Sequence, residues 1–225
     1  MSKYKLLIFD FDGTLCATHD AIINSVTKTF EYYNIQPPMG DSIKSTIGKS
    51  LEDAFAILSG GEISRNDKIL KEWVIKYREI YSRIWADHTF LFENVKYLLS
   101  KFVESGIHIV VISNKGAEAV NSALCHYGIK EYISFIAGDI KGVNKKPDPM
   151  PYNKIIKPEF PDVAKKNILM VGDTETDLEF AKNIKVNACW CKYGYGDFEK
   201  CMELNPEYSI SSFLKLDNIV YGNPE

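Results

Sequence analysis

The sequence predicts an α/β fold in which a doubly wound parallel sheet carries an inserted α-helical domain. Short apolar runs end abruptly in polar residues, as do strands that are buried on both faces of a parallel sheet. Helical patterns lie between these runs, and such an alternation is typical of parallel sheets covered by helices on both faces. After the first run, residues 16–89 show helical periodicity and almost no strand signal. The insertion therefore interrupts the alternating pattern once, near its start.

The apolar runs predict strands at residues 5–9, 107–112, 132–137, 168–171 and 186–190. The helical patterns between them cover residues 93–104, 116–127, 149–157 and 175–184. Residues 205–221 are expected to add a last strand and a closing helix. Because crossovers between parallel strands are right-handed, the helices should lie on both faces of the sheet, in a Rossmann-like arrangement.

The insertion is predicted to contain several helices. Pro37-Pro38 and Gly60-Gly61 divide it, and a long helix is expected over residues 64–85. Along that helix an aromatic stripe recurs at helical spacing: Trp73, Tyr77, Tyr81 and Trp85. The stripe favours packing within the insertion, with one edge that could line a cleft. We predict a Rossmann-like core at residues 1–15 and 90–225, an α-helical cap at 16–89, and hinges near 14–17 and 87–92.

Composition excludes several classes of protein. The 225 residues include 27 Lys and Arg against 30 Asp and Glu, a net charge of -3, so nothing indicates a nucleic-acid partner. No apolar run approaches the roughly 20 residues that cross a bilayer, and the first run is too short for a signal-peptide core. The 5 cysteines are irregularly spaced, which argues against a disulfide framework and favours a cytoplasmic location.

Polar and charged side chains follow the predicted strands, at the edge where open parallel sheets bind ligands. They share a position just after a strand or just before a helix: Asp10, Asp12, Ser113, Asn114, Lys146, Asp173 and Asp177. Carboxylates gathered there would repel one another without compensating cations. Lys146 supplies one positive charge, and a hard divalent ion with oxygen ligands, Mg²⁺, would supply two more.

A metal ion beside a lysine is an arrangement that holds phosphoryl groups. Asp10 and Asp12 are two residues apart, so an extended segment points both side chains the same way. One carboxylate can attack phosphorus, while the other protonates the leaving oxygen and later activates water. Ser113 and Asn114 offer neutral hydrogen-bond donors to phosphoryl oxygens. The residues thus favour phosphoryl transfer.

Four segments resemble the four motifs of the haloacid dehalogenase-like hydrolase superfamily. They are Asp10-Phe11-Asp12-Gly13-Thr14-Leu15, Ser113-Asn114-Lys115, Lys146-Pro147 and Gly172-Asp173-Thr174-Glu175-Thr176-Asp177, in the superfamily's order. The resemblance spans residues 5–195, with a helical cap after the first motif. Residues 146–152 and 190–196 are most similar to phosphoglycolate phosphatase-like members.

The resemblance implies that Asp10 is the nucleophile and Asp12 the general acid and base. It implies a Mg²⁺ ion held by Asp10, the main-chain carbonyl of Asp12, and Asp173, with Asp177 in or beside the ligand set. The substrate-binding residues expected are Thr14, Ser113, Asn114, Lys146 and, on a cap loop that should face the site, Lys49. Dehalogenases of the superfamily lack the second aspartate, so the presence of Asp12 favours phosphoester hydrolysis.

The expected function is Mg²⁺-dependent hydrolysis of a small phosphorylated metabolite through an aspartyl phosphate, by a monomer or homodimer. Phosphoglycolate is one candidate substrate, and pyrophosphate, nucleoside monophosphates and sugar phosphates stay open. The alternatives are a phosphosugar mutase or pyrophosphatase of the same superfamily, or a non-catalytic module that accepts a phosphoryl group on an aspartate for signalling. Such a module has no need of a helical cap.

Overall fold

A parallel sheet forms the centre of the molecule. A computed structural model describes residues 2–61, 63, 68–139 and 142–222. Within them, six strands lie in the order β5-β4-β1-β6-β7-β8. Their bounds are Phe135–Ala137, His108–Ile112, Leu6–Phe9, Ile168–Gly172, Asn187–Cys191 and Tyr208–Ile210. Every neighbouring pair is parallel, so the doubly wound α/β fold is confirmed.

Helices cover both faces of the sheet, as the alternation of the sequence predicts. One face packs on α5 (Val95–Glu104), α6 (Ala117–His126) and α10 (Leu216–Tyr221). The other packs on α8 (Glu175–Ile184) and α9 (Phe198–Glu203). Within β1, Leu7 and Phe9 face the first group while Leu6 and Ile8 face the second, the two-residue alternation of a strand.

The helix predicted over 149–157 is confirmed with an altered geometry. The chain is helical over residues 150–159, and Tyr152–Ile156 form a π-helical turn within this run, before α7, Lys157–Glu159. The six-residue helix α9 was not predicted, because a helix of this length shows no clear periodicity.

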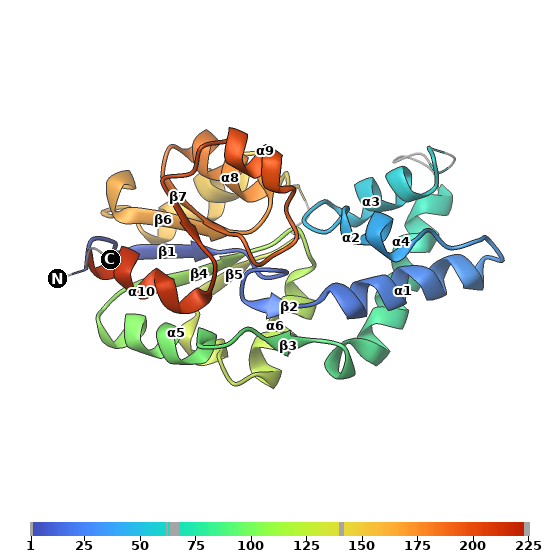
Figure 1. Cartoon of the computed structure of the whole chain (residues 1–225), viewed down its shortest axis with the longest axis horizontal. Coiled ribbons are helices and arrows are strands. Elements are labelled where there is room, and N and C mark those ends of the chain that lie inside the picture. Colours follow the sequence, from blue (N-terminus) through green and yellow to red (C-terminus); the bar gives the residue numbers. More distant parts are fainter. Residues whose placement is uncertain (1, 62, 64–67, 140–141, 223–225) are drawn as a thin grey trace.

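The inserted segment forms a helical cluster with its own apolar centre. It consists of α1 (His19–Tyr32), α2 (Gly40–Lys44), α3 (Leu51–Leu58) and α4 (Lys68–Ile84), followed by a short 3-10 turn. Residues 64–67 of the predicted long helix lie outside the described residues. Trp73 is buried at the centre, edge-on to Phe30 and Phe55 and stacked on Tyr33. Figure 1 shows these helices gathered on one side of the molecule, beyond the end of β1.

A two-stranded antiparallel ribbon connects the helical cluster to the sheet. Strand β2, Cys16–Ala17, pairs with β3, Phe90–Leu91, so the chain enters and leaves the cluster side by side. The Phe92 amide extends the pairing by donating to the Leu15 carbonyl at 3.1 Å. The predicted hinge segments fall on this ribbon, and the cap boundaries stay a prediction. No helix in the described part of the chain is both long and apolar enough to span a bilayer.

Candidate active site

Three adjacent strands bring the chemistry-bearing residues to one edge of the sheet. Strand β1 lies between β4 and β6, in register with both. Asp10 directly follows β1, Ser113 follows β4, and Asp173 follows β6. The Asp10 amide still donates to the Val171 carbonyl at 2.9 Å, so the sheet's hydrogen bonding fixes the backbone at Asp10. The carboxyl ends of these strands therefore form the floor of one site.

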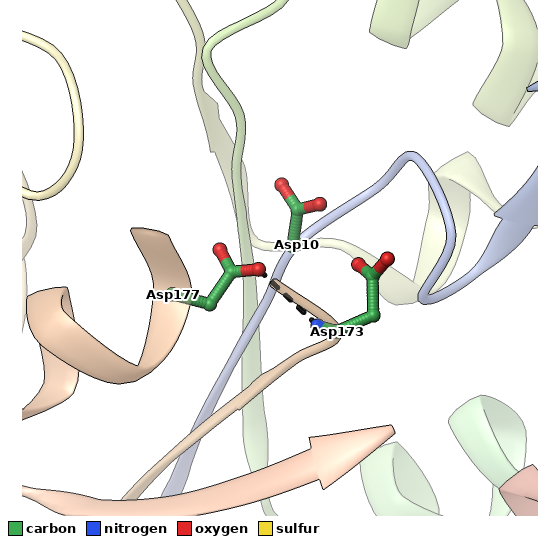
Figure 2. A group of neighbouring side chains, drawn as sticks. All are labelled: Asp10, Asp173 and Asp177. Carbon is green, nitrogen blue, oxygen red and sulfur yellow. Dashed lines mark hydrogen bonds between the residues drawn. The ribbon is translucent and has the colours of Figure 1, made fainter. Parts of the chain in front are cut away.

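Three buried carboxylates meet on this floor. Oxygen atoms of Asp10, Asp173 and Asp177 all lie within 4.8 Å of one another. Figure 2 shows them converging from three elements: Asp10 from the end of β1, Asp173 from the end of β6, and Asp177 from the first turn of α8. Their residues are at most 3% exposed. Such a cluster needs cations, because like charges buried together destabilise one another.

Lys146 supplies one of these cations. Its Nζ donates to Asp10 Oδ1 at 2.7 Å, to Asp177 Oδ1 at 2.6 Å and to the Ile112 carbonyl at 3.1 Å. An ammonium has three hydrogens, so these contacts use all of its donors. The predicted role of Lys146 in phosphate binding stays a prediction; in this conformation the lysine neutralises carboxylates.

Asp173 is held by neutral donors. Thr14 Oγ1 donates to its Oδ1 at 2.9 Å, and the Tyr195 amide donates to its Oδ2 at 2.8 Å. Gly13, with φ of 84°, and Gly194 pass so close that a Cβ on either would lie 2.1–2.2 Å from Asp173 atoms. Only glycine fits these two positions, since the backbone itself surrounds the carboxylate. Thr14 thus contacts Asp173, and its predicted substrate contact stays a prediction.

Asp177 is fixed by the start of α8. Its Oδ2 accepts hydrogen bonds from the amides of Asp173 and Thr174 at 3.2 and 3.0 Å, and from Thr174 Oγ1 at 2.9 Å. Thr174 and Asp177 together form a capping box, which satisfies helix-end amides that otherwise lack partners. The Asp177 carboxylate therefore caps the start of α8 through Oδ2 and accepts a hydrogen bond from Lys146 through Oδ1.

The electrostatics of the cluster fit an additional cation. Burial raises the pKa of Asp10 to about 7, against the lowering effect of Lys146. Burial also raises the pKa of Asp173 well above its usual range, and the charges of Asp10 and Asp177 add to this. Among the described residues, no cationic side chain forms an ion pair with Asp173. The carboxylates of the cluster offer hard oxygen ligands, and the charge of Asp173 has no cationic partner among these residues. Mg²⁺ prefers ligands of this kind.

Asp12 has a separate cationic partner. Lys115 Nζ lies 3.0 Å from Asp12 Oδ1 and 4.2 Å from the centre of the Tyr81 ring. The sequence places Lys115 in the second motif, but sequence reasoning assigned it no role. Its position directly after Ser113-Asn114 is the signal that could have identified it. The pair places Asp12 near Tyr81 of α4, at the helical cluster.

Asn114 connects the helical cluster to the floor. Its Nδ2 donates to the Gly48 carbonyl at 2.9 Å and to the Lys146 carbonyl at 3.0 Å. Gly48 has φ of 93°, and a Cβ there would lie 2.9 Å from Thr174 Cγ2. Both amide hydrogens of Asn114 are thus engaged with carbonyls, so its predicted substrate contact stays a prediction.

A chain of charges makes a second connection. Lys145 pairs with Glu52 of α3 at 3.0 Å and with Asp139 at 3.3 Å, and Asp139 pairs with Arg78 of α4 at 3.2 Å. Acidic and basic groups alternate across the boundary between the helical cluster and the sheet. The loop 45–50, the first turn of α3 and the interior of α4 are therefore held over the carboxylate floor.

A cavity of about 340 Å³ lies between the floor and the helical cluster. Asp10 and Asp12 line it from below. Of the predicted substrate-binding residues, Lys49, Ser113 and Asn114 also line it, whereas Thr14 and Lys146 contact the carboxylates. The Ser113 hydroxyl accepts a hydrogen bond from the Lys115 amide at 3.2 Å, so its own hydrogen stays available as a donor.

Comparisons with known proteins agree with this geometry. The family model described as haloacid dehalogenase-like hydrolase matches residues 7–191. A Clostridium perfringens protein provisionally named pyrophosphatase PpaX is 29% identical, over 96% of this chain and 97% of its own. A phosphoglycolate phosphatase of Vibrio cholerae is 24% identical, over 92% of this chain and 93% of its own. A crystal structure from Bacteroides fragilis, provisionally described as a haloacid dehalogenase-like hydrolase, superposes with a TM-score of 0.87. It is 25% identical, and the match covers 95% of this chain and 100% of that one.

Replacing Lys146 by methionine removes the cation that bridges Asp10 and Asp177. In metal-free buffer at neutral pH we expect the free energy of unfolding to fall by about 3–5 kcal/mol, because a buried ion pair loses one partner. Urea unfolding followed by circular dichroism measures the change. Lys200→Met is the matched control, since Lys200 is exposed and lies 3.8 Å from Asp197, and it should change little. Equal stability of the two variants would contradict the assigned role of Lys146.

Proposed function

The chain belongs to the haloacid dehalogenase-like hydrolases, and from this premise we propose that it is a Mg²⁺-dependent phosphatase acting on a small phosphomonoester. The single observation that carries the proposal is the carboxylate of Asp10, which lies on the cavity floor 2.7 Å from Lys146 Nζ, with Asp12 lining the same cavity. The reaction would pass through an aspartyl phosphate on Asp10. The names of the relatives support phosphoester or pyrophosphate cleavage and disagree on the substrate.

Asp10 would begin the reaction. Its carboxylate attacks phosphorus, a P–O bond to Asp10 forms, and the ester P–O bond on the opposite side breaks. Asp12 gives a proton to the leaving oxygen, so the product departs as an alcohol. Lys115 Nζ lies 3.0 Å from Asp12 Oδ1 and would hold this side chain at the cavity floor.

The second half-reaction would reverse the role of Asp12. Its carboxylate takes a proton from water, the water oxygen attacks phosphorus, and the bond to Asp10 breaks to release inorganic phosphate. Asp10 and Asp12 are then restored to their starting protonation states. Asp12 thus donates one proton in the first step and regains one in the second. The two in-line steps therefore need no reactant other than the phosphate ester and water.

Asp10, Asp173 and the main-chain carbonyl of Asp12 would hold the Mg²⁺ ion, with Asp177 beside them. When bound, the ion supplies positive charge to the phosphoryl oxygens as the transition state forms. The uncompensated carboxylate of Asp173 supports this assignment. Lys146 balances the remaining charge of Asp10 and Asp177.

The helical cluster, residues 16–89, would act as a cap that excludes bulk water. Its loop 45–50 contacts the floor through Asn114, and α3 and α4 reach it through Lys145 and Asp139. Exclusion of water protects an acyl phosphate from premature loss of its phosphoryl group and strengthens the electrostatic contacts. The cap boundaries and the hinges on the β2–β3 ribbon belong to this proposal.

The thiols of the chain support the cytoplasmic location expected from the sequence. All five cysteines are free, and four of them are buried. Reduced thiols are the usual state in that compartment.

Substituting the nucleophile tests the covalent mechanism. Asp10→Asn keeps the volume of the side chain but removes the attacking charge, so phosphate release should fall by at least about a thousandfold. Malachite-green detection of phosphate from a generic ester, with circular dichroism as the check on folding, measures this. Asp162→Asn is the control, because Asp162 is exposed at the surface. A folded Asp10→Asn enzyme with near-normal turnover would refute the proposed nucleophile.

Removal of divalent metal tests the proposed cofactor. EDTA should stop phosphate release, and Mg²⁺ in excess of the chelator should restore it, because Asp173 and its neighbours need the ion's charge. Differential scanning fluorimetry should also show that Mg²⁺ raises the midpoint of thermal unfolding, by more in the native protein than in Asp173→Asn. Activity indifferent to EDTA would remove Mg²⁺ from the mechanism.

A paired glycine substitution tests whether the cap must contact the floor. Gly48→Ala places a methyl group 2.9 Å from Thr174 Cγ2 at a φ of 93°, so the loop must move away from the floor. We expect kcat/KM to fall about tenfold or more. Gly61→Ala imposes similar backbone strain at a φ of 85° but meets nothing within 4 Å. If both variants lost activity equally, backbone strain rather than the contact would explain the loss.

A further inference from the structure

The wall of the cavity that faces the floor is mostly apolar. Its apolar and aromatic residues come from α1, from the segment 46–54, and from α4 with the turn after it: Ile22, Val26, Ile47, Leu51, Ala54, Tyr77, Tyr81 and Trp85. The polar side chains on the lining from the same segments are Thr46, Lys49, Arg78 and Ser82. Tyr77 and Tyr81 stack with ring centres 5.8 Å apart and an interplanar angle of 27°. We call these eight residues the cap wall. The aromatic stripe predicted from the sequence is thus divided, with Trp73 inside the cap and its other members on the cavity.

The charged groups of the cavity do not favour a second anion. Lys115 is paired with Asp12, and Arg78 is paired with Asp139. Lys49 is exposed to solvent, where an ammonium is well hydrated and attracts an anion weakly. Glu118 is a further acid on the lining and offsets one of these cations. Beyond the phosphoryl group, the cavity offers no surplus of buried positive charge in its described lining.

In-line chemistry directs the leaving group toward the cap wall. Asp10 attacks from the floor, so the leaving oxygen lies on the opposite side of phosphorus, where Asp12 can reach it. The remainder of the leaving group then extends into the space below α1, α3 and α4. A volume of about 340 Å³ is within the range of small-molecule sites, about 300–1,000 Å³.

We propose that the leaving alcohol of the substrate carries an uncharged apolar group about the size of an aromatic ring, which packs against the cap wall. The inference rests on the phosphatase function proposed above and narrows its substrate class. A carboxylate, as in phosphoglycolate, or a second phosphate, as in pyrophosphate, would lose hydration against this wall without gaining a buried cation. An apolar group gains from the same burial.

A panel of matched phosphate compounds tests the inference. Benzyl phosphate, glycerol 1-phosphate and 2-phosphoglycolate all release primary alcohols, so differences in leaving-group chemistry are small; pyrophosphate completes the set. With Mg²⁺ present, kcat/KM for benzyl phosphate should exceed that for 2-phosphoglycolate and pyrophosphate by at least about tenfold. Preference for either anionic compound over benzyl phosphate would overturn the inference and leave the phosphatase function intact. Release of phosphate from none of the compounds would refute the phosphatase function, and the inference with it.

A substitution on the cap wall provides an independent test. Leu51→Arg puts a cation on the cavity from the first residue of α3, while Ile57→Arg puts the same group on the exposed side of that helix. The ratio of kcat/KM for benzyl phosphate to that for 2-phosphoglycolate should fall about tenfold in Leu51→Arg and stay unchanged in Ile57→Arg. A purely structural effect would lower both rates together without moving the ratio, and that result would overturn the role of the wall.

Discussion

The structure depends on the balance of charge among three buried carboxylates and one lysine. Asp10, Asp173 and Asp177 are brought together from two strands and a helix, and Lys146 contacts two of them with all its donors in use. A Cβ at Gly172 would lie 2.3 Å from Asp177 Cβ, nearly as close as those at Gly13 and Gly194 would lie to Asp173. The backbone is therefore packed against the carboxylates and leaves no room for a Cβ at these glycines, while Asp173 has no ion-pair partner among the described residues. Reactive sites commonly lower the stability of the fold. A carboxylate cluster whose charges were all balanced within the protein would have little affinity left for a metal ion or a substrate.

Sequence reasoning located the cluster because parallel sheets place the ends of their strands at one edge. Asp10 and Asp173 each follow an apolar run that could hardly be anything but a buried strand, and Lys146 precedes a proline-rich turn. Sequence reasoning could not predict the hydrogen-bond partners of these side chains. Thr14 and Asn114 were assigned to the substrate because a motif gives residue types, whereas the structure directs Thr14 to Asp173 and Asn114 to two carbonyls. A hydroxyl or amide accepts many partners, and only the three-dimensional packing decides among them.

In the cap, too, sequence reasoning did not predict the contacts between elements. Helical periodicity identified the helices of the cap and its aromatic stripe, but periodicity describes one face of one helix. Trp73 and Tyr77 are four residues apart on the same face of α4, yet Trp73 is enclosed by Phe30, Phe55 and Tyr33 while Tyr77 also borders the cavity. Which end of such a stripe faces a cavity depends on where the helix crosses its neighbours, and that depends on contacts among residues far apart in the sequence.

The position of the cap and the position of the lysine are coupled through Asn114, in addition to the ion pair between Lys145 and Glu52. Asn114 donates to Gly48 in the cap and to the main chain of Lys146 in the core, so its amide contacts both. Withdrawal of the loop 45–50 would leave one amide hydrogen of Asn114 without its carbonyl and would open the cavity to water. Water would then solvate Asp10 and weaken every contact that depends on the low dielectric of the closed site. Under the proposed mechanism, closure of the cap over a substrate would therefore strengthen the contacts of the charged floor, and a leaving group packed against the cap wall would stabilise the closed state.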